Sequence, residues 1–207
     1  MTSTGVADDL PGELVLLRHG QTEWSRTHRH TGLTDVPLTP LGERQAAARA
    51  DALSRRRPVA AFTSPLQRAR RTAELAGLAA EVEVDHDLLE WDNGAYEGRT
   101  TADIRGDHPG WWLWTDGAPG GESAEQVGVR CARTVARVAP LLAQGDVVLV
   151  GHGHALRALA AVWLGLPASQ GGLFTMDEAG LSVLGTYRGH RVVRRWGVPA
   201  EPAGQVA

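Results

Sequence analysis

The stretch ELVLLRHG, residues 13–20, decides how the rest of the sequence is interpreted. The run from Glu13 to Leu17 is mostly apolar and gives way at once to an Arg-His-Gly triplet, which is the pattern of a buried strand that ends in a loop. The stretch from Asp146 to Val150 repeats this pattern, because His152 follows it closely. We therefore expect the polar chemistry of this protein to begin where its strands end.

Strands and helices alternate outward from these two runs. Thr39-Pro40 and Ser64-Pro65 each supply an N-cap followed by a proline in the first helical turn. The first of these helices is expected to reach Arg57, and the second is expected to end at Gly77. The other expected elements are strands at 59–62, 82–84, 181–187 and 191–196, and helices at 123–143 and 155–164.

This alternation predicts an α/β fold, a three-layer α/β/α sandwich with a mostly parallel sheet and one antiparallel edge strand. With 207 residues, the chain has the length of one ordinary domain. We expect this domain to span residues 13–198, between a flexible N-terminus (1–12) and a flexible tail (199–207). In such folds, functional side chains gather at the carboxyl ends of the strands.

The composition narrows the range of functions. The formal net charge of -3 gives no broad attraction to nucleic acid or to an anionic membrane. All 21 basic residues are arginine, which excludes a P-loop or Schiff-base lysine and suits bidentate contacts to phosphate. Cys131 is the only cysteine and no apolar run is long enough to span a bilayer, so we expect a cytoplasmic protein. The sequence leaves open whether the chain is a monomer or a homodimer.

Five polar residues are placed to meet at one edge of the sheet. Four of them each follow an expected strand, namely Arg18, His19, Glu90 and His152. The fifth, Arg68, lies near the start of an expected helix. Two arginines and a helix N-terminus attract a phosphate dianion, two histidines can act as nucleophile and donor, and a carboxyl group can transfer a proton. Taken singly, Arg68 and Glu90 are better explained as surface charges. As a set, the five residues indicate phosphoryl transfer.

At these positions the sequence resembles the histidine phosphatase superfamily, also called phosphoglycerate-mutase-like. The resemblance rests on LRHGQTEW (17–24), TGLTD (31–35), LTPLG (38–42), SPLQRA (64–69), EWDNGAYEG (90–98) and VGHGHALR (150–157). These motifs follow one another over nearly the whole chain. Residues 21–40, 114–117 and 152–157 look especially like acid phosphatases of actinobacteria and sedoheptulose-bisphosphatases of fungi within the superfamily.

The resemblance implies a role for each of the five residues. By this resemblance, His19 accepts the phosphoryl group and Glu90 donates a proton to the leaving oxygen. Arg18, Arg68 and His152 would form the phosphate pocket. The resemblance also implies five substrate-binding residues, namely Gln21, Ser25, Thr31, Gly32 and Gly153. Many family members have an asparagine where this chain has Ser25. No metal ion or other cofactor is expected.

The predicted activity is hydrolysis of a small phosphorylated metabolite, such as a sugar phosphate, through a phosphohistidine intermediate. For Glu90 to act as the acid, part of it must be protonated. Burial beside Trp91 is expected to raise the pKa of its carboxyl, whereas the charges of the arginines lower it. The tryptophan-rich segment that continues to Gly121 is expected to form a lid or a pocket wall.

Three alternatives remain open at the level of the sequence. The first is a phosphoglycerate mutase, but mutases of the family carry a longer segment after the glutamate, with more basic residues than the three found between Gly98 and Glu122. The second is a metal-dependent hydrolase that uses His152 and His154 as ligands. The third is a protein that binds a phosphorylated ligand without turnover.

Overall fold

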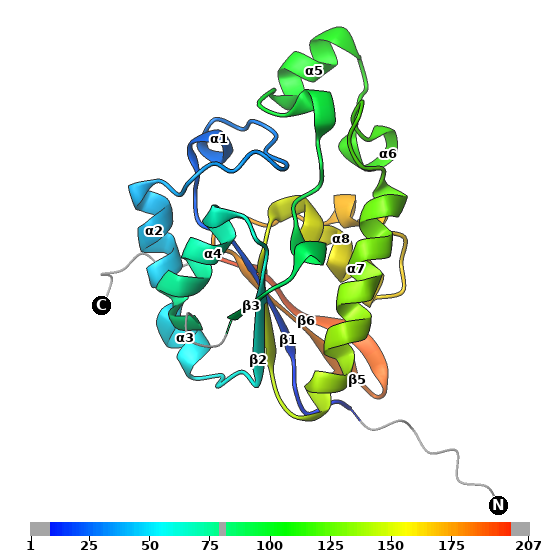
Figure 1. Ribbon diagram of the computed structural model, residues 1–207. Helices are drawn as coiled ribbons and strands as arrows, with labels where there is room; N and C mark the ends of the chain where they lie inside the picture. Colours follow the sequence, from blue (N-terminus) through cyan, green and yellow to red (C-terminus); the bar gives the residue numbers. More distant parts are fainter. Residues whose placement is uncertain (1–8, 79–81, 200–207) are drawn as a thin grey trace, which may run out of the picture.

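A six-stranded sheet forms the centre of the molecule in the computed structural model, which describes residues 9–78 and 82–199 (Figure 1). The strand order is β3-β2-β4-β1-β5-β6. The strands are β1 (Leu14–Arg18), β2 (Ala60–Thr63), β3 (Val82–Val84), β4 (Val147–Gly151), β5 (Leu181–Tyr187) and β6 (His190–Val198). The first four strands in chain order run parallel, whereas β5 is antiparallel to both β1 and β6. The predicted α/β fold is confirmed, and its antiparallel edge is the hairpin β5–β6.

Helices cover the sheet and extend beyond one of its ends. The α-helices are α1 (Glu23–Arg26), α2 (Pro40–Ala47), α3 (Ala50–Ser54), α4 (Gln67–Ala73), α5 (Thr101–Asp107), α6 (Leu113–Asp116), α7 (Ala124–Val138) and α8 (Gly153–Trp163). Shorter helical turns are η1 (Glu74–Leu78), η2 (His86–Leu88), η3 (Gly94–Tyr96), η4 (Ala139–Ala143) and η5 (Ala168–Leu173). In Figure 1, α1, α5 and α6 lie above the end of the sheet toward which β1 runs.

The sheet has an apolar core on each face, because successive side chains of a strand point to opposite sides. Leu14 and Leu16 of β1 belong to a core that includes the buried side chains of α7 and α8. Val15 and Leu17 belong to a second core, with buried side chains of α3 and α4. Figure 1 shows the same division, with α2, α3 and α4 on one side of the sheet and α7 on the other. The three layers of the predicted sandwich follow from this alternation.

The helix predicted from Thr39 to Arg57 is two helices in the structure. Thr39 caps α2 as expected, since its hydroxyl oxygen accepts a hydrogen bond from the N–H of Gly42 at 3.0 Å. The backbone N–H of Arg49 donates to the carbonyl oxygen of Ala46, three residues earlier and not four as in an α-helix, and the chain turns here before α3. The Arg49 side chain donates to the carbonyl oxygens of Ala179 and Val198 at 2.7 and 2.6 Å. This contact with a distant segment leaves no local signal in the sequence.

The helix predicted to start at Ser64-Pro65 begins two residues later. Leu66 is the N-cap of α4 and makes no side-chain cap. The Ser64 hydroxyl instead lies 2.7 Å from Nε2 of His152, so its main partner is in the active-site region. The predicted stop is confirmed, because Gly77 adopts a positive φ of 82° there. The capping box predicted in front of α7 is also present.

The predicted flexible ends lie mostly outside the described residues, which exclude 1–8 and 200–207. Within the described part, the N–H of Leu10 donates to the Thr186 hydroxyl at 2.7 Å, and that of Gly12 donates to the carbonyl oxygen of Leu142 at 2.9 Å. The division into one domain with two tails stays a prediction. None of the described helices combines the length and the apolarity needed to cross a membrane. A cytoplasmic location also stays a prediction.

Candidate active site

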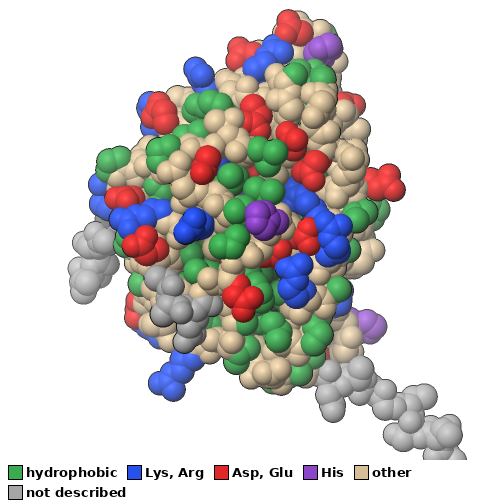
Figure 2. Space-filling view, viewed as in Figure 1, with side chains coloured by type: hydrophobic (Ala, Val, Ile, Leu, Met, Phe, Trp, Pro, Cys, Tyr) green, Lys and Arg blue, Asp and Glu red, His purple; other side chains and the backbone are tan. Residues whose placement is uncertain are grey.

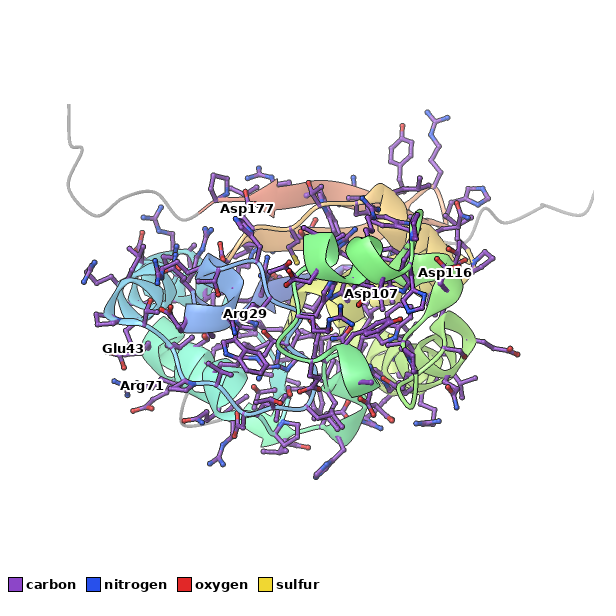
Figure 3. The ribbon with its side chains drawn as sticks, turned by 90° about the horizontal axis from the view of Figure 1, so that it is seen from above. Arg29, Glu43, Arg71, Asp107, Asp116 and Asp177 are labelled. Atoms are coloured by element: carbon purple, nitrogen blue, oxygen red, sulfur yellow. The ribbon has the colours of Figure 1, made fainter. Side chains whose placement is uncertain are left out.

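Polar side chains meet at the end of the sheet where the four parallel strands have their carboxyl ends. His19 follows β1, Ser64 follows β2 and His152 follows β4, while Glu90 comes after β3 and η2. A cavity of about 220 Å³ opens at this end and is lined by segments far apart in the sequence. Figure 3 looks onto the same end, with Arg29 near its middle. The lining residues are Arg18, His19, Ser25, His28, Arg29, His30, Thr31, Glu90, Thr101, Gly153, His154, Arg157 and Met176.

His19 is held in one tautomer with its other nitrogen available. Its Nδ1 lies 2.7 Å from the carbonyl oxygen of Gly20. Because a carbonyl can only accept, Nδ1 carries the proton and Nε2 keeps its lone pair. Gly20 packs so closely that a Cβ would lie 2.2 Å from the Gly42 carbonyl oxygen, so this position requires glycine. Burial, with the positive charges of Arg68 and Arg18, holds the pKa of His19 well below 6.5. His19 therefore presents a neutral ring near neutral pH, which is the state that a nucleophilic histidine requires.

Arg68 and His152 lie behind His19 and do not line the cavity. Both side chains are fully buried, and the centroids of the His19 and His152 rings are 5.2 Å apart. Nε of Arg68 donates to Nδ1 of His152 at 3.1 Å, which places the proton of the neutral ring on Nε2, facing Ser64. The terminal nitrogens of Arg68 donate to backbone carbonyl oxygens of residues 32–34. Arg68 therefore acts on the cavity through its charge.

Arg18 reaches the cavity with part of its hydrogen-bonding capacity unused. Its Nη1 donates to the carbonyl oxygen of Met176, while its buried Nε has no partner in the described part of the chain. Gly153, the first residue of α8, lies alongside, and a Cβ there would be 3.4 Å from this Nε. A guanidinium in this position has donors left for the oxygen atoms of a phosphate.

Glu90 is a buried carboxylate that backbone amides bind. Oε1 accepts from the N–H groups of Trp91 and Ala155, each at 2.8 Å, and Oε2 accepts from the N–H of His154 at 3.2 Å. Two of these amides belong to the first turn of α8, where the helix favours a negative charge. Nδ1 of His154 lies 3.7 Å from Oε2.

These contacts decide the charge of Glu90. Burial raises the pKa of its carboxyl, but the His154 side chain, the neighbouring His152 imidazole and the Trp91 N–H outweigh burial and hold the pKa well below 4.5. The expectation that burial beside Trp91 keeps this carboxyl partly protonated is therefore wrong for the protein without substrate. The sequence pattern did not reveal that the amides of α8 bind the carboxylate.

Three of the five predicted substrate-binding residues line the cavity, namely Ser25, Thr31 and Gly153. The Ser25 hydroxyl also belongs to the capping box of α1, where its oxygen accepts from the N–H of Thr22 at 2.9 Å. Gln21 and Gly32 do not line the cavity. The side-chain oxygen of Gln21 accepts from the Thr39 hydroxyl at 3.1 Å, and the carbonyl oxygen of Gly32 accepts from the guanidinium behind His19 at 2.8 Å.

The phosphatase prediction did not include five basic side chains that line the cavity, although the metal-dependent alternative named one of them, His154; the five are His28, Arg29, His30, His154 and Arg157. The rings of His30 and His154 stack with centroids 5.9 Å apart. Burial, with the charge of His154, lowers the pKa of His30 to about 4. A signal existed for His154 and Arg157, because a spacing of three residues places them on one face of α8. The other three lie in a loop without periodicity.

The tryptophan-rich segment, predicted as a lid or pocket wall, contributes Thr101 to the cavity lining, while its tryptophans lie behind two lining histidines. The buried rings of Trp111 and Trp114 contact those of His30 and His154, with centroids 5.3 and 5.7 Å apart. The indole N–H of Trp111 donates to the carbonyl oxygen of Gly117 at 2.9 Å, which fixes the ring inside its own segment. The tryptophans thus position the two histidines.

The described residues contain no group of three or more His, Cys, Asp or Glu side chains that could hold a metal ion. His152, one of the two alternative metal ligands, has protein partners at both ring nitrogens, and one of them is an N–H of Arg68. A metal ion at His152 would have to displace that guanidinium or the Ser64 hydroxyl. The geometry gives the metal-dependent alternative no support.

Known proteins resemble this chain over most of its length. The family model described as histidine phosphatase superfamily (branch 1) matches residues 14–199. An acid phosphatase of Mycobacterium tuberculosis is 41% identical over 192 residues, which cover 91% of this chain and 94% of that protein. A sedoheptulose 1,7-bisphosphatase of Saccharomyces cerevisiae is 40% identical, with 73% and 67% covered. The solved structure of a mycobacterial glucosyl-3-phosphoglycerate phosphatase with VO3 has a TM-score of 0.82 and 35% identity, covering 90% of this chain and 99% of that one.

Proposed function

Because the chain belongs to the histidine phosphatase superfamily and is a phosphatase, we propose that it hydrolyses a small phosphomonoester through a phosphohistidine formed on His19. The observation that carries the proposal is the state of His19. Its ring is neutral, its Nδ1 proton is bound to the Gly20 carbonyl oxygen, and its Nε2 is left as the nucleophile. The proposal needs no metal ion or organic cofactor.

In the first half-reaction, Nε2 of His19 attacks phosphorus in line with the leaving oxygen. A phosphorus–nitrogen bond forms while the phosphorus–oxygen bond to the alcohol breaks, and the leaving oxygen takes a proton from Glu90. Arg18 binds oxygens of the transferred group, and Arg68 adds its positive charge from behind the ring. In the second half-reaction, Glu90 takes a proton from the attacking water, the phosphorus–nitrogen bond breaks, and inorganic phosphate leaves.

The proton on Glu90 arrives when the substrate binds. Without substrate, the carboxyl is ionised, because its pKa lies well below 4.5. A phosphate dianion beside a carboxylate disfavours the second negative charge and raises the pKa of the carboxyl. Binding of the ester is therefore coupled to the uptake of one proton, which the acid step then uses.

Hydrolysis fits the segment after Glu90 better than mutase activity does. Arg99 pairs with Asp107 at 2.5 Å, and Nε of Arg105 donates to the carbonyl oxygen of Trp111 at 2.9 Å. These arginines are bound within their own segment and do not line the cavity. A bisphosphorylated cofactor would find few basic partners there. The relatives named as phosphatases of a sugar bisphosphate and of a glucosyl-phosphoglycerate favour a small phosphorylated metabolite as substrate.

Trapping of the intermediate tests this proposal. The wild-type protein, quenched during turnover of a ³²P-labelled ester, is expected to carry label that is lost in acid and kept in alkali. His19→Asn should carry no label and should lose at least about 10⁴-fold in kcat. His190→Asn, which changes an exposed histidine at the start of β6, is the matched control and should label normally. Labelling of His19→Asn, or wild-type turnover that is lost after chelation, would contradict the proposal.

A further inference from the structure

Arg157 is a cation in the cavity wall that the proposed phosphoryl transfer does not use. It extends from α8, and its Nε and Nη2 donate to the carbonyl oxygens of Gly171 and Gly172 at 3.1 and 3.4 Å. Its guanidinium carbon lies 4.7 Å from the centre of the Trp114 ring. These contacts fix the guanidinium beside α6 and η5, whereas the nucleophile follows β1.

The charge of Arg157 has no carboxylate partner within the described residues, and its Nη1 has no hydrogen-bond partner there. Burial lowers the pKa of Arg157 to about 10, with Glu90 opposing this change and Arg18 adding to it, so the group stays cationic at neutral pH. A partly buried cation is unfavourable unless an anion compensates it. A second guanidinium without an ion pair in the described part of the chain, that of Arg18, lines the same cavity.

The cavity is also larger than the transferred group requires. Its volume of about 220 Å³ corresponds to roughly seven water molecules at 30 Å³ each. One phosphoryl group at His19 and Arg18 leaves space beside the other lining residues, His154 and Arg157 among them. The planar, fixed guanidinium of Arg157 faces this remaining space, and such a group binds carboxylate and phosphate oxygens well.

Building on the proposed function, we propose that Arg157 binds a second anionic group of the substrate, a carboxylate or a second phosphate. The group to be transferred lies against His19 and Arg18 at the same time. Arg157 is then a residue that determines specificity, because an ester with one anion leaves its charge uncompensated. The substrate class that follows is a small phosphomonoester with two anionic groups.

Two matched substrate pairs test this inference. 3-Phosphoglycerate and glycerol 3-phosphate differ by a carboxylate, and fructose 1,6-bisphosphate and fructose 1-phosphate differ by a second phosphate. The wild type should prefer the two-anion member of at least one pair by about tenfold or more in kcat/KM. Arg157→Gln should lose about 30-fold on that member and less than about threefold on its one-anion partner. Arg70→Gln, an exposed arginine outside the cavity, is the control and should match the wild type on all four.

Three results would overturn the inference: a wild type that does not discriminate within either pair, equal losses of Arg157→Gln on both members of a pair, and no loss at all. The wild-type comparison decides the matter even if Arg157→Gln fails to fold, and Arg157→Lys, which keeps the charge, should keep most of the preference. Failure of the proposed function would look different. In that case the wild type would form no phosphoenzyme with any of the four esters.

Discussion

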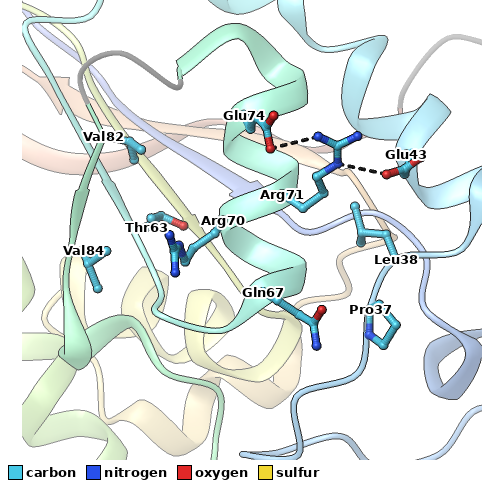
Figure 4. A pocket seen from close by; sticks show the side chains of 10 residues that line it. All are labelled: Pro37, Leu38, Glu43, Thr63, Gln67, Arg70, Arg71, Glu74, Val82 and Val84. Carbon is cyan, nitrogen blue, oxygen red and sulfur yellow. Dashed lines mark hydrogen bonds and ion pairs between the residues drawn. The ribbon is translucent and has the colours of Figure 1, made fainter.

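Two hollows of this molecule differ in whether their arginines form ion pairs with neighbouring carboxylates. The larger one, of about 650 Å³, is a groove beside α4 and β3, where Arg71 contacts Glu43 and Glu74 at 2.9 Å each (Figure 4). The smaller one is the active-site cavity of about 220 Å³. The only carboxylate among its lining residues, Glu90, is bound by backbone amides, and the arginines that line it form no ion pair within the described residues.

The partner of the carboxylate decides whether the arginines are available to a ligand. In the groove, the carboxylates of Glu43 and Glu74 balance the charges of its two arginines, Arg70 and Arg71, so this hollow attracts an anion weakly despite its volume. In the cavity, the first turn of α8 satisfies the carboxylate and leaves the guanidinium groups with unused donors. Over the face seen in Figure 2, acidic and basic side chains are interspersed, in contrast to the cavity, where three arginines and one carboxylate line the wall.

The largest effect is expected from Glu90→Gln, which keeps the shape of the side chain and removes its exchangeable proton. For glycerol 3-phosphate, kcat/KM should fall by about 10²- to 10⁴-fold, because the alkoxide leaving group needs the proton. For para-nitrophenyl phosphate the loss should be much smaller, since nitrophenolate leaves without one. Equal losses on both esters in steady-state assays would mean that Glu90 is not the acid.

The next effect is expected from Arg18→Gln, which removes a cation of the cavity without affecting the amides that bind Glu90. In the proposed function Arg18 contacts the transferred group itself, so kcat/KM should fall by about 10²- to 10³-fold on one-anion and two-anion esters alike. This uniform loss distinguishes it from Arg157→Gln. Initial rates on the two matched pairs measure the difference. A loss confined to the two-anion esters would instead assign Arg18 to the second anionic group.

A smaller effect, on stability, follows from the low pKa of Glu90 in the folded protein. A carboxyl group whose pKa is lower in the folded than in the unfolded protein stabilises the fold at pH values above its unfolded pKa, near 4.5. This stabilisation is lost as the pH falls through the pKa of the folded protein. The free energy of unfolding of the wild type should therefore exceed that of Glu90→Gln by about 1.5–3 kcal/mol at pH 7, and this difference should become smaller below pH 4.5. Urea unfolding of both proteins at several pH values measures the gap. A gap that does not change with pH would contradict the assignment of an ionised Glu90.

The smallest effect is expected from Arg71→Gln in the groove. The two pairs it breaks are each more than two-fifths exposed on both sides, so the free energy of unfolding should change by no more than about 0.5 kcal/mol. Turnover of every ester should stay within about twofold of the wild type. A large loss of activity would show that the groove also binds substrate, which would remove the contrast between the two hollows.

Local signals in the sequence were sufficient for the sheet and for the residues that follow its strands. The bounds Val82–Val84 of β3 were predicted as observed, and β1 and β4 differ from their predictions by one residue. Buried strands leave continuous apolar runs, and in a parallel sheet their carboxyl ends fall on one edge. For this reason the sequence pattern alone could place His19 and Glu90 together.

Contacts between distant segments were beyond the reach of local patterns. Arg49, where the predicted helix breaks, donates to carbonyl oxygens of Ala179 and Val198, and Glu90 accepts from amides 64 and 65 positions further along the chain. Arg157 belongs to the same class, because Trp114 and the carbonyl groups of η5 direct its guanidinium toward the cavity. Each of these features requires the tertiary fold, which no window of sequence contains.

The place of β1 in the sheet has a consequence for biosynthesis. β1 is made first, yet its neighbours are β4 and β5, and the backbone N–H of His19 bonds to the carbonyl oxygen of Gly151. At about 5–20 residues per second, a ribosome needs roughly ten to thirty seconds to reach the second neighbour. For most of that interval β1 has neither of its partner strands, and the backbone contact that holds His19 beside Gly151 waits for β4.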